Sequence, residues 1–361
     1  MAQEDGGCMV DRETTRLIQE TVARFVSPHA RVARVLPAAM ASHEQGWSGA
    51  KIARFRVSLR DGASLTLLTK TMGLKERRVM DRLTRQGHAH TPFTHALDLE
   101  ADSPVLSCMQ DLGTEKVGIP IQDDAPLSAD LDAQVAAALA DIHTRHLGCA
   151  AELSWLPHAD VAYVTGFLLP EMWRARWDQA LASNREFAHE FARYTPQLEE
   201  AGARFARAVR VLWDEGTSLT LTHGELHGEH VVLWRGRPYF LDWGWAYYGP
   251  FYLDLPAYFT PRTVHRYRNA LAQRGVDIAE ADFMEHYHEM GRYIGFRYLC
   301  GGIWEWQNAP GSVIGRRLLL AIRWALDGTW QHRALAVPDG AWRQLLAAHQ
   351  AANCERQLDV D

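Results

Sequence analysis

The spacing of apolar residues changes its period near residue 110, and this change restricts the folds that the chain can adopt. Before it, three segments alternate apolar and polar side chains in the manner of β-strands: 30–38, 52–59 and 64–70. The Asp61-Gly62 pair between the last two segments is a hairpin signal. After the change, residues 128–146 and 166–215 carry the spacing of amphipathic helices. We expect an α+β protein with a small antiparallel β-rich part and a large helical part.

Helices and short strands complete the β-rich part. Residues 11–26 place apolar side chains, Val26 included, on one helical stripe behind Asp11, which is a residue type favoured at N-caps. Residues 74–86 have the composition of a second helix. Two further short strands are expected around 94–99 and 104–109.

The helical part is interrupted once by segments of strand character. Three short β-type segments follow one another there: 219–222, 231–234 and 239–242. After Pro261 the pattern is helical again. We therefore expect an N-lobe over residues 1–109, with an N-terminal helix, an antiparallel sheet and one further helix. A helical C-lobe would follow over residues 110–361 and contain the three short strands.

Net charge, hydropathy and cysteine spacing argue against several classes of protein. The formal net charge is −6, which is unfavourable for a nucleic-acid partner. No apolar run has membrane-spanning length and the N-terminus has no signal-peptide core, so we expect a cytoplasmic protein without a membrane partner. The 5 cysteines lie far apart and never form C-x-x-C, which favours reduced thiols over a cysteine zinc site. No feature indicates an oligomeric state.

Residues 222–230, with the sequence THGELHGEH, concentrate groups that could bind a metal or transfer a proton. His223, His227 and His230 have the i, i+4, i+7 spacing that would place three zinc ligands on one face of a helix. However, two glycines inside the segment each disfavour a helix by roughly 1 kcal/mol, and β-type segments precede and follow it. A loop between two strands is the favoured interpretation, and a zinc site on a helix is the alternative.

A loop at this place would lie near the aspartate that ends the last of the three short strands. Catalytic groups commonly lie on loops that rigid strands position. Glu225 in the loop and Asp242 at the strand end could therefore come together. Two such oxygen ligands suit a Mg²⁺ ion that carries substrate phosphates.

The order of motifs along the chain resembles the aminoglycoside phosphotransferase/choline kinase-like family, whose members are relatives of the protein kinases. HGELHGEH, LDW and GPFYLDL stand where that family has H-G-D-x-x-x-x-N, I-D-W/F and D-x-x-x-D-L. Upstream segments match the same family in order: EQGWSGAKIARFRV, LLTKTMGLKERRVMDRL, VLSCMQDLG and LADIH. The resemblance covers roughly residues 30–260. It implies a bilobal protein-kinase-like fold, phosphoryl transfer from ATP or GTP, and Mg²⁺ as cofactor.

The resemblance assigns two residues of the β-rich part to the nucleotide phosphates. Lys70 would pair with the α- and β-phosphates, and Glu76 would orient it. A solvated lysine at the end of a strand and a glutamate at a helix N-terminus are the ordinary alternatives. Because only four of the 38 basic residues are lysines, a lysine that is retained favours a role that arginine cannot fill.

Two further segments would complete the nucleotide site in the family pattern. Backbone N–H groups near Gly46, Ser48 and Gly49 would approach the phosphates, although an ordinary hairpin loop would have the same composition. The hinge would contact adenine through the main-chain atoms of Cys108, Met109 and Gln110.

Two residues of the 223–230 loop depart from the family pattern. Glu225 stands where the family has the aspartate that serves as catalytic base, and its side chain reaches about 1.5 Å further. His230 stands where the family has a metal-binding asparagine, and Mg²⁺ prefers oxygen to imidazole nitrogen. Macrolide phosphotransferases also have histidine at this place. The resemblance implies that Asp242 and His230 bind the metal and that Glu225 is the catalytic residue.

Three hypotheses about function follow. The first is an ATP- or GTP-dependent O-phosphotransferase acting on a hydroxyl of a small molecule. An antibiotic, a sugar or an amino alcohol would be the acceptor, and resistance or self-protection would be the purpose. The second is a weak or inactive nucleotide-binding pseudokinase, which the changes at Glu225 and His230 suggest. The third is a zinc-dependent hydrolase that uses the histidines of residues 223–230.

Acceptor choice would depend on the helical residues 150–215 and 262–331. Trp304, Glu305 and Trp306 could form an aromatic and acidic wall for a cationic or sugar-bearing acceptor. The alternative, a helix core with a solvated acidic face, is slightly favoured.

Overall fold

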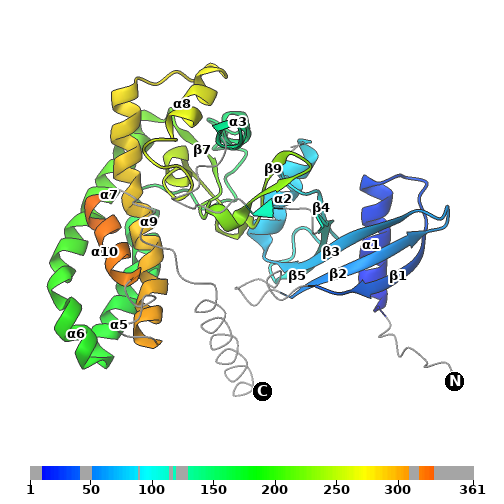
Figure 1. Ribbon diagram of the computed structural model, residues 1–361, viewed down its shortest axis with the longest axis horizontal. Helices are drawn as coiled ribbons and strands as arrows, with labels where there is room; N and C mark the ends of the chain where they lie inside the picture. The colour runs from blue at the N-terminus through cyan, green and yellow to red at the C-terminus, as the bar shows by residue number, and fades with distance from the viewer. Residues whose placement is uncertain are drawn as a thin grey trace. The chain divides into compact units, whose positions relative to one another are not determined.

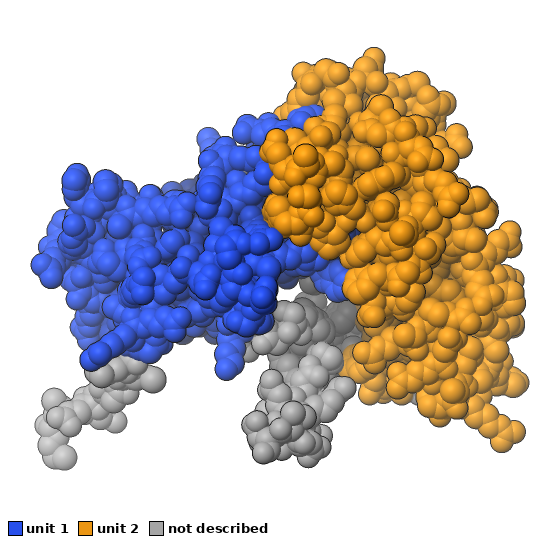
Figure 2. Space-filling view, turned by 180° about the vertical axis from the view of Figure 1, so that it is seen from behind, with its two compact units in different colours: residues 1–120, 134–145, 221–247 blue, residues 121–133, 146–220, 248–361 orange. Residues whose placement is uncertain are grey.

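The computed structural model describes most of the 361-residue chain, namely residues 10–40, 51–87, 90–113, 117–118, 129–308 and 317–328 (Figure 1). The chain divides into two compact units, which Figure 2 colours separately. Unit 1 comprises residues 1–120, 134–145 and 221–247, and unit 2 comprises residues 121–133, 146–220 and 248–361. Across the described ranges, no helix combines the length and the apolar character that a membrane crossing requires.

A five-stranded antiparallel sheet is the centre of unit 1. Its strands are β1 (Val32–Ala38), β2 (Ile52–Leu59), β3 (Ser64–Met72), β4 (Thr94–Ala96) and β5 (Val105–Gln110). They lie in the order β1-β2-β3-β5-β4, so that the expected meander of the first three strands is confirmed. The hairpin between β2 and β3 turns at Gly62, whose φ of 90° is a conformation that glycine adopts without strain.

Helix α1 (Arg12–Phe25) packs against one face of this sheet (Figure 1). Asp11 caps it as expected, because its side chain accepts a hydrogen bond from the Thr14 amide at 2.8 Å. Leu17 and Val22 are fully buried against the sheet residues Phe55, Val57 and Leu67. The stripe ends earlier than predicted, since Val26 is the C-cap residue and is 45% exposed.

The opposite face of the sheet carries charged side chains. Strand residues two apart point to the same face, and antiparallel partners share a face. Lys70 pairs with Ile52 and Ser107, and Leu68 pairs with Arg54 and Met109. The face that α1 leaves uncovered therefore carries Lys70 and Arg54.

Unit 1 also contains two helices and a small ribbon. Helix α2 (Leu74–Arg85) follows β3, as predicted, and helix α3 (Ala129–Arg145) begins in unit 2 and ends in unit 1. Strands β6 (Val117–Gly118), β8 (Val231–Trp234) and β9 (Arg237–Phe240) form the ribbon in the order β6-β8-β9. β9 begins and ends two residues earlier than the predicted 239–242. Asp242 lies outside the strand because its left-handed backbone, with φ 64° and ψ 67°, cannot continue it.

Strands β7 (Leu219–Thr222) and β10 (Tyr247–Pro250) pair with each other, and the chain passes from one unit to the other within each of them. β7 has the predicted bounds.

Unit 2 is mainly helical, as expected. Its helices are α4 (Val161–Tyr163), α5 (Ala175–Ser183), α6 (Arg185–Phe191), α7 (Thr195–Glu215), α8 (His265–Ala272), α9 (Glu280–Asn308) and α10 (Arg317–Asp327). Glycines of α9 allow close packing on α10, since a Cβ on Gly295 would lie 2.0 Å from the Ala325 amide nitrogen. Between α4 and α5 the chain forms π-helical turns around Pro170, which has no N–H to donate to an α-helical bond.

For Glu305 and Trp306, the structure favours the helix-core interpretation over the aromatic and acidic wall. Trp306 is 5% exposed, and its ring centroid lies 5.3 Å from that of Phe187 and 5.4 Å from that of Phe191. Glu305 is buried and bound to Arg317, with 2.7 Å between Oε1 and Nη1. Neither side chain is presented to an acceptor.

Candidate functional site

Lys70 lies in β3 on the sheet face opposite α1. β3 continues to Met72, so Lys70 stands two residues inside the strand rather than at its end as predicted. Its neighbours across the sheet are Ile52 on β2 and Ser107 on β5. The Lys70 side chain is only 12% exposed, which argues against the alternative of a solvated lysine.

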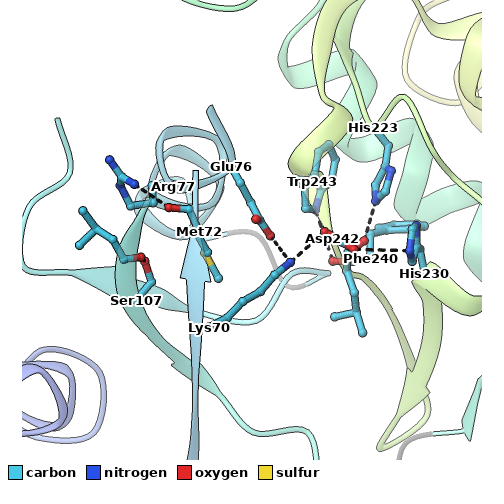
Figure 3. Close-up of polar contacts among 12 residues, drawn as sticks. Lys70, Met72, Glu76, Arg77, Ser107, His223, His230, Phe240, Asp242 and Trp243 are labelled. Carbon is cyan, nitrogen blue, oxygen red and sulfur yellow. Dashed lines mark hydrogen bonds and ion pairs between the residues drawn. The ribbon is translucent and has the colours of Figure 1, made fainter. Parts of the chain in front are cut away.

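The Lys70 ammonium group binds two carboxylates from distant parts of the sequence (Figure 3). Its Nζ lies 2.7 Å from Glu76 Oε1, in the first turn of α2, and 2.8 Å from Asp242 Oδ1, just after β9. Burial alone would lower the pKa of Lys70, but the two carboxylates outweigh burial and raise it. The lysine therefore stays charged, and the structure brings Lys70, Glu76 and Asp242 together within unit 1.

The two carboxylates respond differently to this shared cation. Burial raises the pKa of Glu76, and the attraction of Lys70 offsets only part of that effect. Burial also acts to raise the pKa of Asp242, but Lys70, followed by His230 and His223, lowers it below its ordinary value. Asp242 is the more accessible of the two, with 41% of its side chain exposed against 10% for Glu76.

Asp242 occupies a backbone conformation that few residues other than glycine adopt. Its φ of 64° lies in the left-handed region, which costs an ordinary residue on the order of 1 kcal/mol or more. A short 3₁₀ turn begins at the next residue, yet the Asp242 side chain makes no capping hydrogen bond to it. The carboxylate is thus directed to Lys70 and His230 rather than used to cap the start of the turn.

The segment 223–230 is a loop that ends in a 3₁₀ turn (Gly228–His230), as the favoured interpretation predicted. His223 is fully buried, and its Nε2 donates to the Leu241 carbonyl at 2.7 Å. Its Nδ1 then accepts the Glu225 N–H at 3.3 Å. His223 therefore ties the loop to the chain immediately before Asp242.

Gly224 lets this loop approach the segment after Asp242. Its φ is 76°, and a Cβ at this position would lie 2.2 Å from the Trp245 carbonyl oxygen and 2.8 Å from Tyr247 Cε1. A side chain there would force the two segments apart. The glycine is thus required by contact as well as by conformation.

His230 links the backbone of Glu225 to Asp242. Its Nδ1 lies 2.8 Å from the Glu225 carbonyl oxygen, which can only accept, so this nitrogen carries a proton. Its Nε2 lies 3.7 Å from Asp242 Oδ2. Both Nε2 and Oδ2 can offer a lone pair, so a cation between them would be stabilised by each. The donor set of Asp242 and His230 therefore fits a divalent metal in part, although Mg²⁺ prefers oxygen.

The zinc alternative finds no support in this geometry. The rings of His227 and His230 lie in contact but tilted by 31°, with centroids 3.9 Å apart. Among the residues that the structure describes, no group of three or more histidine, cysteine, aspartate or glutamate side chains is arranged to hold a metal ion. One ring nitrogen of His223 and one of His230 bond to backbone carbonyls and hold the loop.

The remaining predicted residues lie in two places. The predicted nucleotide loop, with Gly46, Ser48 and Gly49, lies outside the described residues. The predicted hinge residues belong to β5, where Cys108 and Met109 pair with both β3 and β4 and the Gln110 N–H bonds to the Phe93 carbonyl. The first residues beyond the sheet are Asp111 to Gly113, and adenine contact by the hinge stays a prediction.

Sequence reasoning missed one buried ion pair near this hinge. Arg54 Nε lies 2.8 Å from Asp111 Oδ2, and Arg54 Nη2 lies 3.2 Å from Asp111 Oδ1. Arg54 is 8% exposed, although it stands in a strand whose alternation alone would not predict a buried charge. Its position in the strand was the available signal, because the alternation of β2 and β3 places Arg54 on the same face of the sheet as Lys70.

Comparison with known proteins supports the same relationship that the motifs indicated. The model of the phosphotransferase enzyme family matches residues 54–291, which is more than half of the chain. No curated protein matches the chain by sequence.

Solved structures resemble the fold at low sequence identity. Choline kinase from Cryptosporidium parvum Iowa II has a TM-score of 0.55 and 12% identity, covering 87% of this chain and 95% of its own. Spectinomycin phosphotransferase, in a complex with ADP and spectinomycin, has a TM-score of 0.50 and 12% identity, covering 90% and 94%. These likenesses confirm the predicted α+β, bilobal protein-kinase-like fold, with a small β-rich N-lobe and a large, mainly helical C-lobe.

Proposed function

Because the chain belongs to the phosphotransferase enzyme family and is a phosphotransferase with a hydroxyl acceptor, we propose that it transfers the γ-phosphate of ATP, or of GTP, to a small molecule. The observation that carries this proposal is the Lys70–Glu76–Asp242 cluster, in which one buried lysine is held by two carboxylates. Phosphoryl transfer relies mainly on positioning and on stabilising charge, and this cluster offers both.

Lys70 is the group that binds the phosphates of the nucleotide. Its ion pair with Glu76 holds the ammonium group on the sheet face opposite α1, and the raised pKa keeps it charged. The bond to Asp242 takes the place that a phosphate oxygen would occupy, so nucleotide binding exchanges one anionic partner of Lys70 for another.

Asp242 and His230 are the residues that would hold Mg²⁺. Asp242 stays ionised because its pKa is lowered, and its Oδ2 atom is not engaged by Lys70, which bonds to Oδ1. A Mg²⁺ ion bound there would neutralise charge that develops on the transferred phosphate. The left-handed backbone of Asp242 keeps the carboxylate in this orientation.

Glu225 is the group that would accept the proton of the acceptor hydroxyl. Its backbone is fixed on both sides, since the N–H bonds to His223 and the carbonyl bonds to His230. A fixed backbone places the longer glutamate side chain reproducibly, which a general base requires. Glu225→Gln should reduce the transfer rate by about 10²-fold or more, because a general base contributes on that order.

The acceptor that we propose is a sugar-containing compound or an amino alcohol, with hydroxylated antibiotics as the class to examine first. The structurally similar spectinomycin phosphotransferase was solved with an antibiotic bound, which supports that order of search. Resistance or self-protection would be the consequence. We also propose that the chain divides into an N-lobe over residues 1–109 and a C-lobe over 110–361. The same proposal includes a cytoplasmic location, where ATP and Mg²⁺ are abundant.

A nucleotide-consumption screen tests this function. The full chain would be incubated with ATP or GTP and Mg²⁺ against a panel of aminoglycosides, macrolides, nucleoside antibiotics, sugars and amino alcohols. Acceptor-dependent consumption, with a phosphorylated product seen by mass spectrometry, is the expected result. Nucleotide binding without transfer to any member would favour the second candidate, a pseudokinase, which the glutamate at position 225 supports. The absence of nucleotide binding would contradict both.

A further inference from the structure

The Arg54–Asp111 pair lies on the same face of the sheet as Lys70. Arg54 stands opposite Leu68 on β3, and Leu68 is two residues before Lys70. Side chains two apart in a strand point to one face, so Arg54 and Lys70 share the face that α1 leaves uncovered. A group bound by Lys70 would have Arg54 as a neighbour one step along the sheet.

The ion pair between Arg54 and Asp111 is bidentate and buried. Two guanidinium nitrogens of Arg54 bond to the two carboxylate oxygens of Asp111, at 2.8 Å and 3.2 Å. The side chains are 9% and 1% exposed, so solvent screens the interaction little. Such parallel bonds fix orientation as well as distance, which a single bond from lysine would not do.

Asp111 begins a segment that is held at several points. Its Oδ1 also accepts the Gly113 N–H at 2.8 Å, which closes a turn over Asp111–Gly113. Between them, Leu112 is 4% exposed and packs against Val232 and Tyr239 of the ribbon. The conformation of the segment that follows β5 is therefore fixed, and Arg54 connects this segment to β2.

Stability alone does not account for a charged pair at this place. A buried ion pair can often be replaced by apolar side chains of similar volume without loss of stability, because burial of both charges costs about as much as their attraction returns. A fixed orientation of the segment after β5 is what the bidentate pair provides in addition. Arg54 Nη1 also donates to the Ala39 carbonyl at 3.4 Å, just after β1.

We propose that Arg54 and Asp111 are positioning residues that hold the segment 111–113 in place to bind the base and ribose of the nucleotide. This inference rests on the proposed function, since it requires a nucleotide whose phosphates lie at Lys70. The pair acts on the part of the ligand that differs between ATP and inorganic tripolyphosphate. It does not contact the transferred phosphate.

The test compares two ligands on the full chain. Binding of Mg²⁺–ATP and of Mg²⁺–tripolyphosphate would be measured by calorimetry for the unmodified protein, Arg54→Ala, Arg54→Lys and Asp111→Asn. Arg56→Ala is the matched control, because Arg56 stands two residues further along the same face of β2 and is exposed. The melting temperature of each variant without ligand would be recorded in parallel.

Arg54→Ala should raise the Kd for ATP by about tenfold or more, the factor that ~1.4 kcal/mol produces. Its Kd for tripolyphosphate should stay within about twofold, as should both constants of Arg56→Ala. If Arg54→Ala fails to fold, Arg54→Lys takes its place in the test. Arg54→Lys should also weaken ATP binding, because lysine cannot form both bonds to Asp111.

Unchanged ATP binding by folded Arg54→Lys and Asp111→Asn, with only a lower melting temperature, would show a purely structural pair and overturn the inference. Equal losses for ATP and tripolyphosphate would also overturn it. Failure of the unmodified protein to bind ATP at all would instead contradict the proposed function.

Discussion

Two glutamates, one in each compact unit, are buried and bound by a cation from another element, but their surroundings differ. In unit 1, Glu76 shares Lys70 with Asp242, and Asp242 is 41% exposed. In unit 2, Glu305 on α9 binds Arg317 at the start of α10, and the two side chains are only 8% and 14% exposed. Lys70 therefore has a partner that a ligand can reach, whereas the Glu305–Arg317 contact is enclosed.

Backbone geometry separates the two regions further. Asp242 has a left-handed backbone that the surrounding loop must maintain, while Glu305 lies in a regular helix beside a tightly packed aromatic group. A buried ion pair alone is thus weak evidence of a site. An exposed member on a strained backbone, with a histidine on its other side, is the combination that indicates function.

Removal of Asp242, the exposed partner of Lys70, should have the largest effect of the changes that test the difference between the two regions. Asp242→Ala should reduce phosphate transfer by about 10³-fold or more, the scale seen when a main charge-stabilising group is lost. The melting temperature should change little, since Glu76 retains Lys70 as its partner. Asp61→Ala, at the exposed β2–β3 hairpin, should transfer phosphate at the normal rate. Retained activity in Asp242→Ala would remove this residue from the site.

The enclosed pair in unit 2 should affect stability rather than activity. Burial raises the pKa of Glu305 to about 7, and Arg317 only partly offsets it. Because the folded pKa is raised, the contribution of this group is fully present below pH 4.5 and is lost as pH rises through about 7. Relative to Glu305→Gln, the unmodified protein should lose up to about 3 kcal/mol of unfolding free energy over that range.

Urea denaturation at several pH values would measure this difference, and Glu289→Gln on the same helix provides a control of opposite sign. Burial acts to raise the pKa of Glu289, but Arg292 and Arg204 lower it overall. Its contribution is therefore present above pH 4.5 and lost as pH falls through its lower folded pKa. Parallel pH profiles for the two variants would show that their environments do not differ as described.

The smallest change that should sharpen the comparison is Lys70→Arg. Arginine keeps the charge, but its planar guanidinium does not fit a place where one ammonium group reaches both Glu76 and Asp242. A displacement near 1 Å can cost about 10²-fold in rate, and we expect a loss of that size in kcat. Lys51→Arg, at an exposed lysine, should leave kcat unchanged. Full activity of Lys70→Arg would show that only the charge is needed.

Much of this site was predictable because its signals are local. Alternation gave β2 its correct bounds, and the motifs around Lys70 and Asp242 predicted that these two residues, 172 apart in sequence, come together. β-branched neighbours and two glycines were enough to favour a loop at 223–230 over a helix. The left-handed backbone of Asp242 carries no such signal, so the end of β9 was placed two residues too late.

The features that the sequence did not predict depend on contacts between distant segments. The Arg54–Asp111 bond spans 57 residues, and neither residue stands out in its own segment. Trp304, Glu305 and Trp306 have the composition of a ligand wall, but α10 and α6 enclose the latter two. Only packing determines whether such side chains face a ligand or a neighbouring helix.

A crystal structure of the full chain with Mg²⁺ and a non-hydrolysable ATP analogue would test most directly whether the nucleotide binds at the Lys70–Glu76–Asp242 cluster. We expect Lys70 Nζ to keep its bond to Glu76, to release Asp242 and to contact a phosphate oxygen, while Asp242 coordinates the metal. An analogue bound away from this cluster, with the 2.8 Å contact between Lys70 and Asp242 intact, would contradict this expectation.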